Sequence, residues 1–510
     1  MYSRVMSLGL YGLDGYSVVV EADTSSGLPA FDIVGLPDAS VSESRNRVRS
    51  AIKNSGFSFP VSRITVNLAP ADKKKSGPMY DLPIMLSILL ASSQLEASIS
   101  KTAFLGELSL DGRLRPVSGV LSMALTARRL GLTSLIVPAE NAAEASVASG
   151  LEVYGASSVG QIFDHITNKA RLAKAEPLPF DSIQPDSLLD FSDVKGQLAA
   201  RRAIEIAAAG GHNLLMVGPP GSGKSMLAKR IPSILPPLTY REAIETTKIY
   251  SVADMLSGKE SLIMNRPFRS PHHTVSPAGL TGGGAIPRPG EISLSHNGVL
   301  FLDELPEFSR TAMEVLRQPI ENDEVTISRV AGSLTYPCSV MLVAAMNPCP
   351  CGNFGNPAKE CTCVPHSVER YLSKISGPLL DRIDLHIEVA AVDYDSIASR
   401  SAGECSADIR KRVIAAREIQ LSRFGGTRIS CNAKILSSMM GNTCKMTARA
   451  EQTMKKAFVR LGLSARAYNK VLKVSRTIAD LAGDRIIDVQ HVTEAIQYRI
   501  LDKKYWLKKS

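Results

Sequence analysis

A glycine-rich loop between an apolar run and a helix-compatible segment is the first stretch of this chain that could do chemistry. Apolar residues 214–217 lead into it. Its glycines let successive backbone N–H groups point inward, and the following helix adds positive potential at its N-terminus. The pattern predicts a polyphosphate site, with Lys224 on the β- and γ-phosphates and Ser225 on Mg²⁺; the alternative is a plain glycine-rich turn. The predicted contacts are Gly218, Pro219, Pro220, Gly221, Ser222, Gly223, Lys224, Ser225 and Met226.

Two later apolar runs end in polar side chains that suit the same reaction. Residues 298–302 end in Asp303 and Glu304, and residues 340–346 end in Asn347. At the tips of neighbouring strands, Asp303 would lie near the Mg²⁺, Glu304 would polarise a water molecule, and Asn347 would hydrogen-bond that water or the γ-phosphate. The alternative for Asn347 is a strand-end turn with Pro348. Together with the loop, these residues predict hydrolysis of ATP with Mg²⁺.

Four of the eight cysteines fall in a short loop that begins two residues after Asn347. The spacing, C-x-C-x₉-C-x-C, places four thiolates close together, which suits tetrahedral Zn²⁺. Such a site would be structural, because a complete Cys₄ shell leaves no position open to a substrate. The alternatives are free thiols, an Fe–S cluster or a redox switch. The predicted zinc ligands are Cys349, Cys351, Cys361 and Cys363.

Composition narrows the class of protein. With 510 residues, 44% of them hydrophobic and 21% charged, the chain is long enough for about three globular domains. Its net charge of +10 favours a polyanionic partner, the alternative being a solvated basic surface. The N-terminus lacks an apolar core of signal-peptide length, and no run approaches a membrane span. We therefore expect a cytoplasmic protein without membrane segments and with reduced cysteines.

The sequence as a whole predicts an α/β fold in four parts. Residues 1–170 alternate between strand-like and helix-like patterns. Residues 171–190 mix Pro, Asp and Ser as a linker. An ATPase core follows over 191–394, and residues 395–510 are helical. Predicted strands are 16–23, 31–36, 63–69, 103–108 and 134–139. Predicted helices are 42–56, 81–93, 119–131, 406–426, 433–441, 447–462, 465–483 and 489–501.

Two segments of the core are longer than a minimal ATPase needs. Residues 266–284 are too rich in Pro and Gly for regular structure, and long ordered loops usually carry function. Residues 324–336 alternate around Ala331-Gly332 and predict a hairpin with Arg329 near its tip.

The first 170 residues contain a resemblance to a known catalytic domain. Residues 106–140 and the segment Lys75 to Met79 resemble the proteolytic domain of Lon-type proteases, which implies a ribosomal S5 domain 2-like fold. Met79 stands where that family has its serine nucleophile, and Leu121 stands where it has the catalytic lysine. A thioether and an isobutyl group cannot replace a Ser-Lys dyad. We therefore expect a binding or assembly module and no active protease.

The nucleotide motifs resemble those of AAA+ ATPases, most closely the magnesium-chelatase and MCM-type branch. Over nearly its full length the chain resembles the YifB/ComM family. This resemblance implies a homo-oligomeric ring, commonly a hexamer, with ATP at each subunit interface and a C-terminal helical lid. Arg382, within residues 377–384, then matches the arginine finger, and Arg466, within residues 463–466, matches the sensor 2 arginine. The alternative for each is a structural ion pair.

The resemblance also implies a partner. In the resembled ATPases, inserts project into the ring's pore, which makes Arg329 the first and Arg269 the second choice for a DNA phosphate contact; the alternative for each is a solvated arginine. The expected function is an ATP-driven motor on single-stranded or branched DNA, with helicase or branch-migration activity in homologous recombination and natural transformation. Two alternatives remain, a chelatase-like metal-insertion subunit and a scaffold that senses ATP without unwinding DNA.

Overall fold

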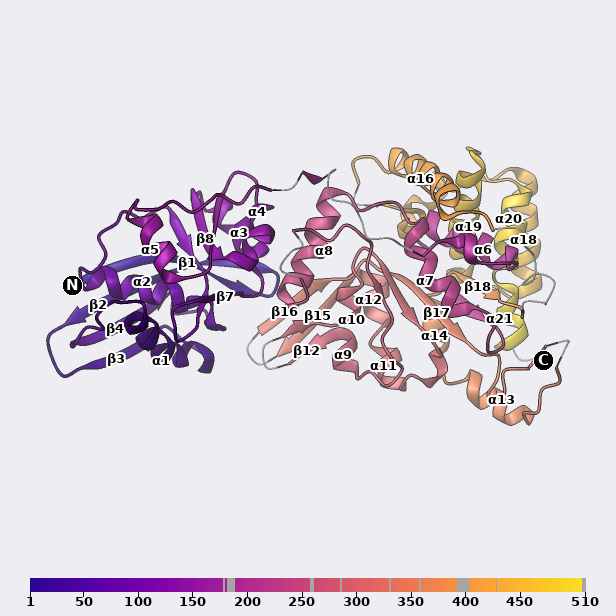
Figure 1. Cartoon of the computed structure of the whole chain (residues 1–510). Coiled ribbons are helices and arrows are strands. Elements are labelled where there is room, and N and C mark those ends of the chain that lie inside the picture. Colours follow the sequence, from indigo (N-terminus) through magenta and orange to yellow (C-terminus); the bar gives the residue numbers. More distant parts are fainter. Residues whose placement is uncertain are drawn as a thin grey trace. The chain divides into compact units, whose positions relative to one another are not determined.

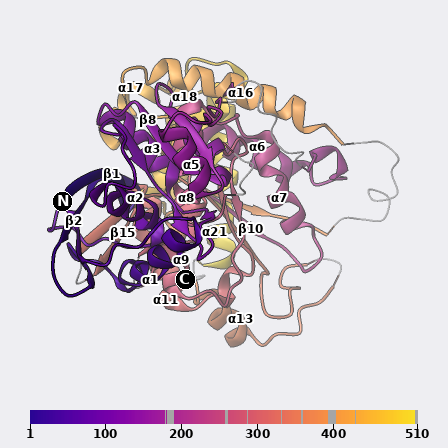
Figure 2. The ribbon, with the colours of Figure 1, turned by 60° about the vertical axis from the view of Figure 1, so that its left-hand side comes forward.

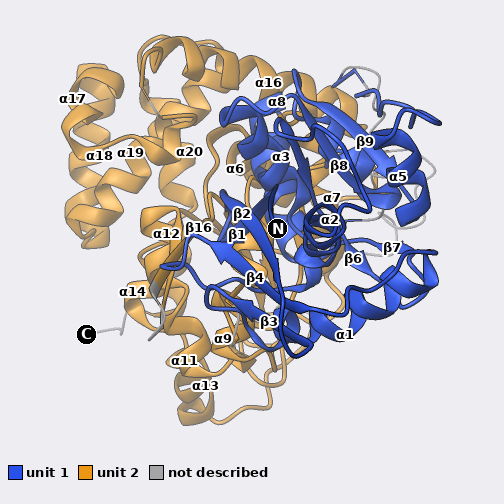
Figure 3. Cartoon of the chain, turned by 90° about the vertical axis from the view of Figure 1, so that its left-hand side faces the viewer, with its two compact units in different colours: residues 1–184, 239–264 blue, residues 185–238, 265–510 orange. Residues whose placement is uncertain are grey.

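The computed structural model divides the chain into two compact units, one formed by residues 1–184 with 239–264 and the other by 185–238 with 265–510 (Figures 1 and 3). Each unit has its own sheet and its own core. The residues described are 1–177, 179–180, 189–256, 261–284, 287–329, 332–356, 359–391, 403–427 and 429–506.

The first unit is built on a seven-stranded mixed sheet in the order β3-β4-β2-β1-β5-β8-β9. The pairs β1–β2 and β2–β4 are antiparallel, and the remaining pairs are parallel. All five predicted strands are present, and β1 near the centre and β9 at an edge are additional. The bounds are β1 Tyr2–Tyr11, β2 Asp14–Ser25, β3 Ala30–Val34, β4 Arg63–Ala69, β5 Thr102–Phe104, β8 Ser134–Pro138 and β9 Glu152–Ala156.

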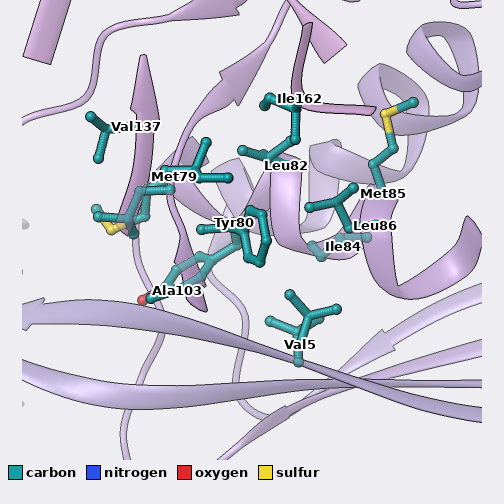
Figure 4. Packing of buried hydrophobic residues seen from close by; sticks show 14 of the residues in the cluster. Val5, Met79, Tyr80, Leu82, Ile84, Met85, Leu86, Ala103, Val137 and Ile162 are labelled. Atoms are coloured by element: carbon teal, nitrogen blue, oxygen red, sulfur yellow. The ribbon is translucent and has the colours of Figure 1, made fainter. Parts of the chain in front are cut away.

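Helix α2 (Asp81–Ala91) forms the centre of the first unit's core (Figure 4). Its sequence is apolar on every side, and a helix of that kind is stable only when it is surrounded. Leu82, Ile84 and Met85 are accordingly buried. The predicted helices over 42–56, 81–93 and 119–131 are confirmed. Helix α1 (Ala39–Asn54) packs against α2. The other helices of this part are α3 Val120–Arg129, α4 Ala142–Ser146 and α5 Val159–Ile166.

Helix α8 (Tyr240–Val252) follows the glycine-rich loop in sequence but packs within the first unit. The Ser251 hydroxyl donates a hydrogen bond to the buried Glu144 carboxylate, and the N–H of Gly119 donates to the Ser251 carbonyl at 3.1 Å. Tyr240 Oη donates to the Val147 carbonyl at 3.3 Å. Residues 239–264 fall within the predicted ATPase core, but the structure groups them with the first unit (Figure 3).

The second unit contains a five-stranded parallel sheet in the order β11-β14-β17-β10-β18. Its three central strands are completely buried, as expected for a parallel sheet covered on both faces. The carboxyl ends of these strands share one edge of the sheet, where the predicted loop and polar side chains follow. The bounds are β10 Leu214–Val217, β11 Phe268–Arg269, β14 Val299–Leu302, β17 Met341–Met346 and β18 Leu385–Glu388, with helices α6 Leu198–Gly210 and α7 Lys224–Ile234.

The C-terminal part of the second unit is helical, and its helices pack beside α6 (Figures 1 and 2). The predicted helix over 433–441 is wrong: two 3₁₀ turns, 432–434 and 437–439, precede the short α17. Asn432 is buried and donates from Nδ2 to Asp480 Oδ2 at 2.8 Å, so tertiary hydrogen bonds replace helical ones. The bounds are α16 Ser406–Arg423, α17 Met440–Thr443, α18 Ala448–Leu461, α19 Ala465–Ala482, α20 Val489–Gln497 and α21 Ile500–Tyr505.

The two long segments of the core, 266–284 and 324–336, differ in secondary structure. Residues 324–337 form the predicted antiparallel hairpin, β15 Glu324–Arg329 with β16 Gly332–Pro337. Residues 266–284 contain short regular elements, contrary to the expectation: β11, α9 Pro277–Thr281 and β12 Gly282–Gly283. Phe268 stacks on Phe301 of β14, and Ser276 caps α9 ahead of Pro277, so local packing and capping overcome the Pro and Gly content.

Candidate functional site

The glycine-rich loop joins β10 to α7 at the carboxyl edge of the parallel sheet. The buried strand ends at Val217, and α7 begins at Lys224. Gly221 and Gly223 have positive φ angles of 76° and 87°. The predicted strand, loop and helix are therefore present in that order. Such a loop presents backbone N–H groups and a helix N-terminus to an anion.

Lys224 lies at the centre of this loop. Its Nζ donates to the carbonyl oxygens of Gly218 at 2.7 Å and Pro219 at 2.9 Å, and to Asn347 Oδ1 at 3.2 Å. Burial lowers the pKa of Lys224, opposed by the charges of Asp303 and Glu304. The amide at the end of β17 and the ammonium of the loop therefore share one site. Both groups remain polar and available to a phosphate oxygen.

Ser225 and Asp303 are also joined. Ser225 Oγ donates to Asp303 Oδ2 at 2.6 Å, which links the start of α7 to the end of β14. A hydroxyl and a carboxylate are hard oxygen ligands of the kind that Mg²⁺ prefers. These two residues would hold the metal together with phosphate oxygens. The donor set fits the predicted cofactor.

Glu304 follows Asp303 in the left-handed backbone region, with φ 52°. Its N–H donates to Asp303 Oδ1 at 3.0 Å, and its carboxylate is more than half exposed. Glu304 Oε2 lies 3.4 Å from Nδ1 of His273, whose ring lies 4.0 Å from that of His272. The 266–284 segment thus reaches the predicted water-activating carboxylate.

The predicted arginines do not gather at the loop in the described part of the chain. Arg382 Nη2 pairs with Glu321 Oε1 at 2.6 Å, and its Nη1 donates to the Pro378 carbonyl at 2.6 Å. Arg466 is exposed in the first turn of α19. Arg269 forms a two-pronged ion pair with Glu291, both N–O distances being 2.7 Å. Arg329 ends β15 as predicted, but its side chain lies outside the described part of the structure.

The four predicted metal ligands converge. The Sγ atoms of Cys349, Cys351, Cys361 and Cys363 all lie within 4.8 Å of one another. Three of the Sγ–Sγ distances are 3.3, 3.6 and 3.7 Å. Tetrahedral zinc with Zn–S bonds of about 2.3 Å requires separations of about 3.8 Å, so the cluster fits this metal.

Backbone amides support the thiolates. The N–H of Cys351 donates to Cys363 Sγ at 3.4 Å, and the N–H of Phe354 donates to Cys349 Sγ at 3.3 Å. The backbone N–H groups of Asn353 and Thr362 lower the pKa of the Cys351 thiol to about 5. Such hydrogen bonds orient metal-binding sulfurs and favour their charged form.

Comparison with known proteins places the chain in a family. Residues 190–397 match the model described as magnesium chelatase, subunit ChlI; residues 20–141 match a second ChlI model, and 403–499 match the ChlI C-terminal model. The uncharacterized protein YifB of Salmonella typhimurium is 44% identical over 96% of both chains. The competence protein ComM of Haemophilus influenzae is 44% identical over 98% of this chain and 97% of its own. The chain belongs to the magnesium chelatase ChlI family. The resemblance to YifB and ComM is thereby confirmed.

The ChlI family is a family of ATPases, so ATP and Mg²⁺ are the expected ligands of this protein. The mixed first unit, the parallel α/β core and the helical C-terminal region agree with the coarse fold prediction. In the part of the chain that the structure describes, no helix is long and apolar enough to cross a membrane.

One contact at this ChlI-family site and one buried ion pair at the opposite edge of its sheet are not predicted from the sequence. In the sequence His273 is one of two adjacent histidines, and its position beside Glu304 depends on the fold. Asp384 lies in the same segment as Arg382 and pairs with Lys470 of α19, Nζ to Oδ1 at 2.9 Å. Burial would raise the pKa of Asp384, but Lys470 and His212 outweigh it and hold that pKa well below its usual range. Lys470 lies one helical turn after Arg466, and this spacing is the sequence feature that could have drawn attention to Lys470.

Proposed function

We propose that this ChlI-family protein is an ATP-hydrolysing ring motor that acts on single-stranded or branched DNA, with helicase or branch-migration activity in recombination. The observation that carries the ATPase part is the pair of contacts Ser225–Asp303 and Lys224–Asn347, which unite the phosphate loop with two neighbouring strand ends. Two further facts support the DNA part: the net charge of +10 and the name of a relative, the competence protein ComM.

Each side chain has a distinct task in this proposal. Lys224 and the loop amides bind the phosphates, Ser225 and Asp303 hold Mg²⁺, and Glu304 orients the attacking water. Bound Mg²⁺ neutralises charge on the phosphate oxygens. Asn347 keeps Lys224 directed into the loop and bonds the water or the γ-phosphate. Glu304 must leave His273 to reach that water, so the His273 contact belongs to a resting arrangement.

The ring, which the family resemblance implies, is supported by the contacts of Arg382. We propose that Arg382 serves the ATP site of a neighbouring copy, since its described polar contacts are with Arg317, Glu321 and Pro378 rather than with its own loop. An inserted guanidinium stabilises charge on the transferring phosphoryl group and is worth about 10³ to 10⁵ in rate. Arg466 acts from the lid of the same ring, commonly a hexamer.

We further propose that the first unit is a Lon-like binding or assembly module without peptidase activity. Met79 and Leu121 are both buried at the positions where the Lon pattern has serine and lysine. Neither side chain can attack a peptide bond or remove a proton.

Hydrolysis assays with DNA test the motor directly. We expect ATP turnover that rises on adding single-stranded or branched DNA, together with displacement of a labelled strand from a branched substrate. Lys224→Ala protein, which should bind nucleotide poorly, is the control. A wild-type protein that neither binds any DNA at low salt with ATP nor is stimulated by it would exclude the motor. A metal-insertion subunit, favoured by the match to the ChlI models, would then be the better proposal.

A further inference from the structure

The cysteine loop continues directly from the nucleotide site. Asn347, whose Oδ1 accepts from Lys224 Nζ at 3.2 Å, is separated from Cys349 by one proline. The first metal ligand is therefore two residues from the amide that contacts the phosphate-loop lysine. Because the intervening residue is a proline, whose backbone is restricted, a movement of the cysteine loop would be transmitted directly to Asn347.

A second contact joins the cysteine loop to the phosphate loop. Gly352 has φ 79°, and its Cα faces Pro220 so closely that an added Cβ would lie 2.3 Å from Pro220 Cδ. Pro220 lies in the middle of the phosphate loop. Gly352 therefore packs directly against one side of the phosphate loop.

The opposite side of the cysteine loop rests on the C-terminal helix α21. The ring of Phe354 lies 6.2 Å from that of Tyr505, and Lys504 Nζ pairs with Glu388 Oε1 at 2.8 Å. Glu388 ends β18 and is the register partner of Val217, the last residue before the phosphate loop. The cysteine loop is thus packed between α21 and Pro220.

Four thiols whose Sγ atoms all lie within 4.8 Å of one another can ligate one metal ion. When all four are ionised they repel one another, and a divalent metal removes that repulsion while fixing the loop's two ends. Cys361 and Cys363 are distant in sequence from Asn347, and the cluster brings them beside Cys349, two residues from that amide.

We propose that Zn²⁺ held by the four thiols braces the phosphate loop, so that metal occupancy sets the affinity for nucleotide. With the metal, Gly352 stays against Pro220 and Asn347 stays beside Lys224. Without it the loop relaxes and both supports are lost. The inference rests on the proposed ATPase function and adds a metal-dependent control of that site.

The first experiment removes the metal at the far end of the loop. Cys361→Ser with Cys363→Ser should abolish zinc binding and weaken binding of a fluorescent ATP analogue about tenfold, a change equal to the loss of one good contact. Cys405→Ser, outside the cluster, should keep about one zinc ion per chain and the parental affinity. Circular dichroism checks that each variant is folded.

The second experiment leaves the thiols intact. Gly352→Ala and Gly355→Ala impose the same backbone strain, since their φ angles are 79° and 77°. Only the Gly352 methyl would strike Pro220, whereas the Gly355 methyl would meet the flexible end of Lys504 at 3.3 Å. Both variants should retain zinc, and only Gly352→Ala should lose about tenfold in nucleotide affinity.

The outcomes separate the inference from the function beneath it. The brace is excluded if a folded, zinc-free double variant binds nucleotide like the parent, if the two alanine variants bind nucleotide equally well, or if wild-type protein purified under reducing conditions contains no zinc. Wild-type protein that contains zinc but binds no nucleotide would instead exclude the proposed ATPase.

Discussion

At the scale of single residues, the site depends on a residue, Glu304, held in a backbone conformation that its residue type does not favour. Glu304 occupies the left-handed region at a cost of about 1 kcal/mol or more for a residue with a Cβ. Its N–H is bonded to the preceding carboxylate, which fixes the backbone and leaves the Glu304 carboxylate projecting from the end of β14. Strain of this kind is found where a reacting group must be held in one place.

Glu304→Gln should separate ATP binding from hydrolysis. Glutamine preserves the size of the side chain and the backbone conformation, but it cannot accept a proton from water. We expect ATP affinity near the parental value and turnover reduced by about 100-fold or more. Measuring both quantities on one preparation checks this, with Lys224→Ala as the variant that should lose both. Turnover at the parental rate would exclude Glu304 from the reaction.

Lys470→Met should reveal the buried charge pair with Asp384. The depressed pKa of Asp384 means that the pair stabilises the fold above the unfolded Asp pKa of about 4 and that this stabilisation is lost as pH falls towards the folded pKa. Asp384 would then be buried without its ammonium partner, with His212 and the Asn213 N–H still in contact, and the loss should cost about 3 kcal/mol at pH 7.

The pH dependence distinguishes this cost from lost packing. Without Lys470, burial raises the pKa of Asp384, so protonation relieves the variant as the pH is lowered. The difference in unfolding free energy between parent and variant should therefore shrink from pH 7 to pH 4. Lys455→Met, at an exposed position of α18, should show no difference at either pH. A loss that stays constant with pH would point to packing alone.

At the scale of elements, the chain shows which patterns predict structure and which do not. Central strands β10, β14 and β17 are continuous apolar runs, and parallel strands bring their ends together, so the contact of Lys224 with Asn347 follows from the sequence. Strand β1 is not predicted in this way, because Gly9 interrupts it. Gly9 is required by packing: an added Cβ would lie 2.5 Å from the Tyr16 ring. The residue that conceals the strand is thus one that the fold demands.

The pairing of Asp384 with Lys470, at the edge of the sheet opposite the nucleotide site, shows the same limit. The two residues lie in separate elements, and the residue pattern of one segment does not predict that it contacts the other. Ligand clusters close in sequence, such as the cysteines, can be predicted from spacing. Pairs across elements depend on how α19 packs against the start of β18.

The hairpin β15–β16 is the element on which the DNA proposal depends. Arg329→Ala should weaken binding across unrelated DNA sequences, flatten its dependence on salt, and abolish DNA-stimulated hydrolysis, because phosphate contacts act through counterion release. Basal hydrolysis should persist. Binding isotherms at several salt concentrations check this, with Arg310→Ala as a control outside the hairpin. A variant that unwinds branched DNA normally would remove the hairpin from the mechanism.

At the scale of the whole molecule, the proposed ring would build each ATP site from residues of two copies. Arg382→Ala protein should be nearly inactive alone, and so should Lys224→Ala protein. Mixed together they should recover part of the activity, because some interfaces then combine an intact loop with an intact arginine. Hydrolysis across a range of mixing ratios measures this. Absence of recovery in rings shown to mix would assign Arg382 to its own chain's site.

The placement of α8 has a consequence for how the chain is made. The first unit is interrupted in sequence, since residues 239–264 belong to it but are synthesised after the phosphate loop. When residues 1–184 have left the ribosome, Ser251 has not yet been synthesised, so the Glu144 carboxylate and the N–H of Gly119 lack their hydrogen-bond partner. The face of α3 that packs on α8 is exposed at that stage. Domains generally fold in the order of their synthesis. Here the first unit can complete its folding only after β10 and α7 have emerged, so the two units must mature in an interleaved order.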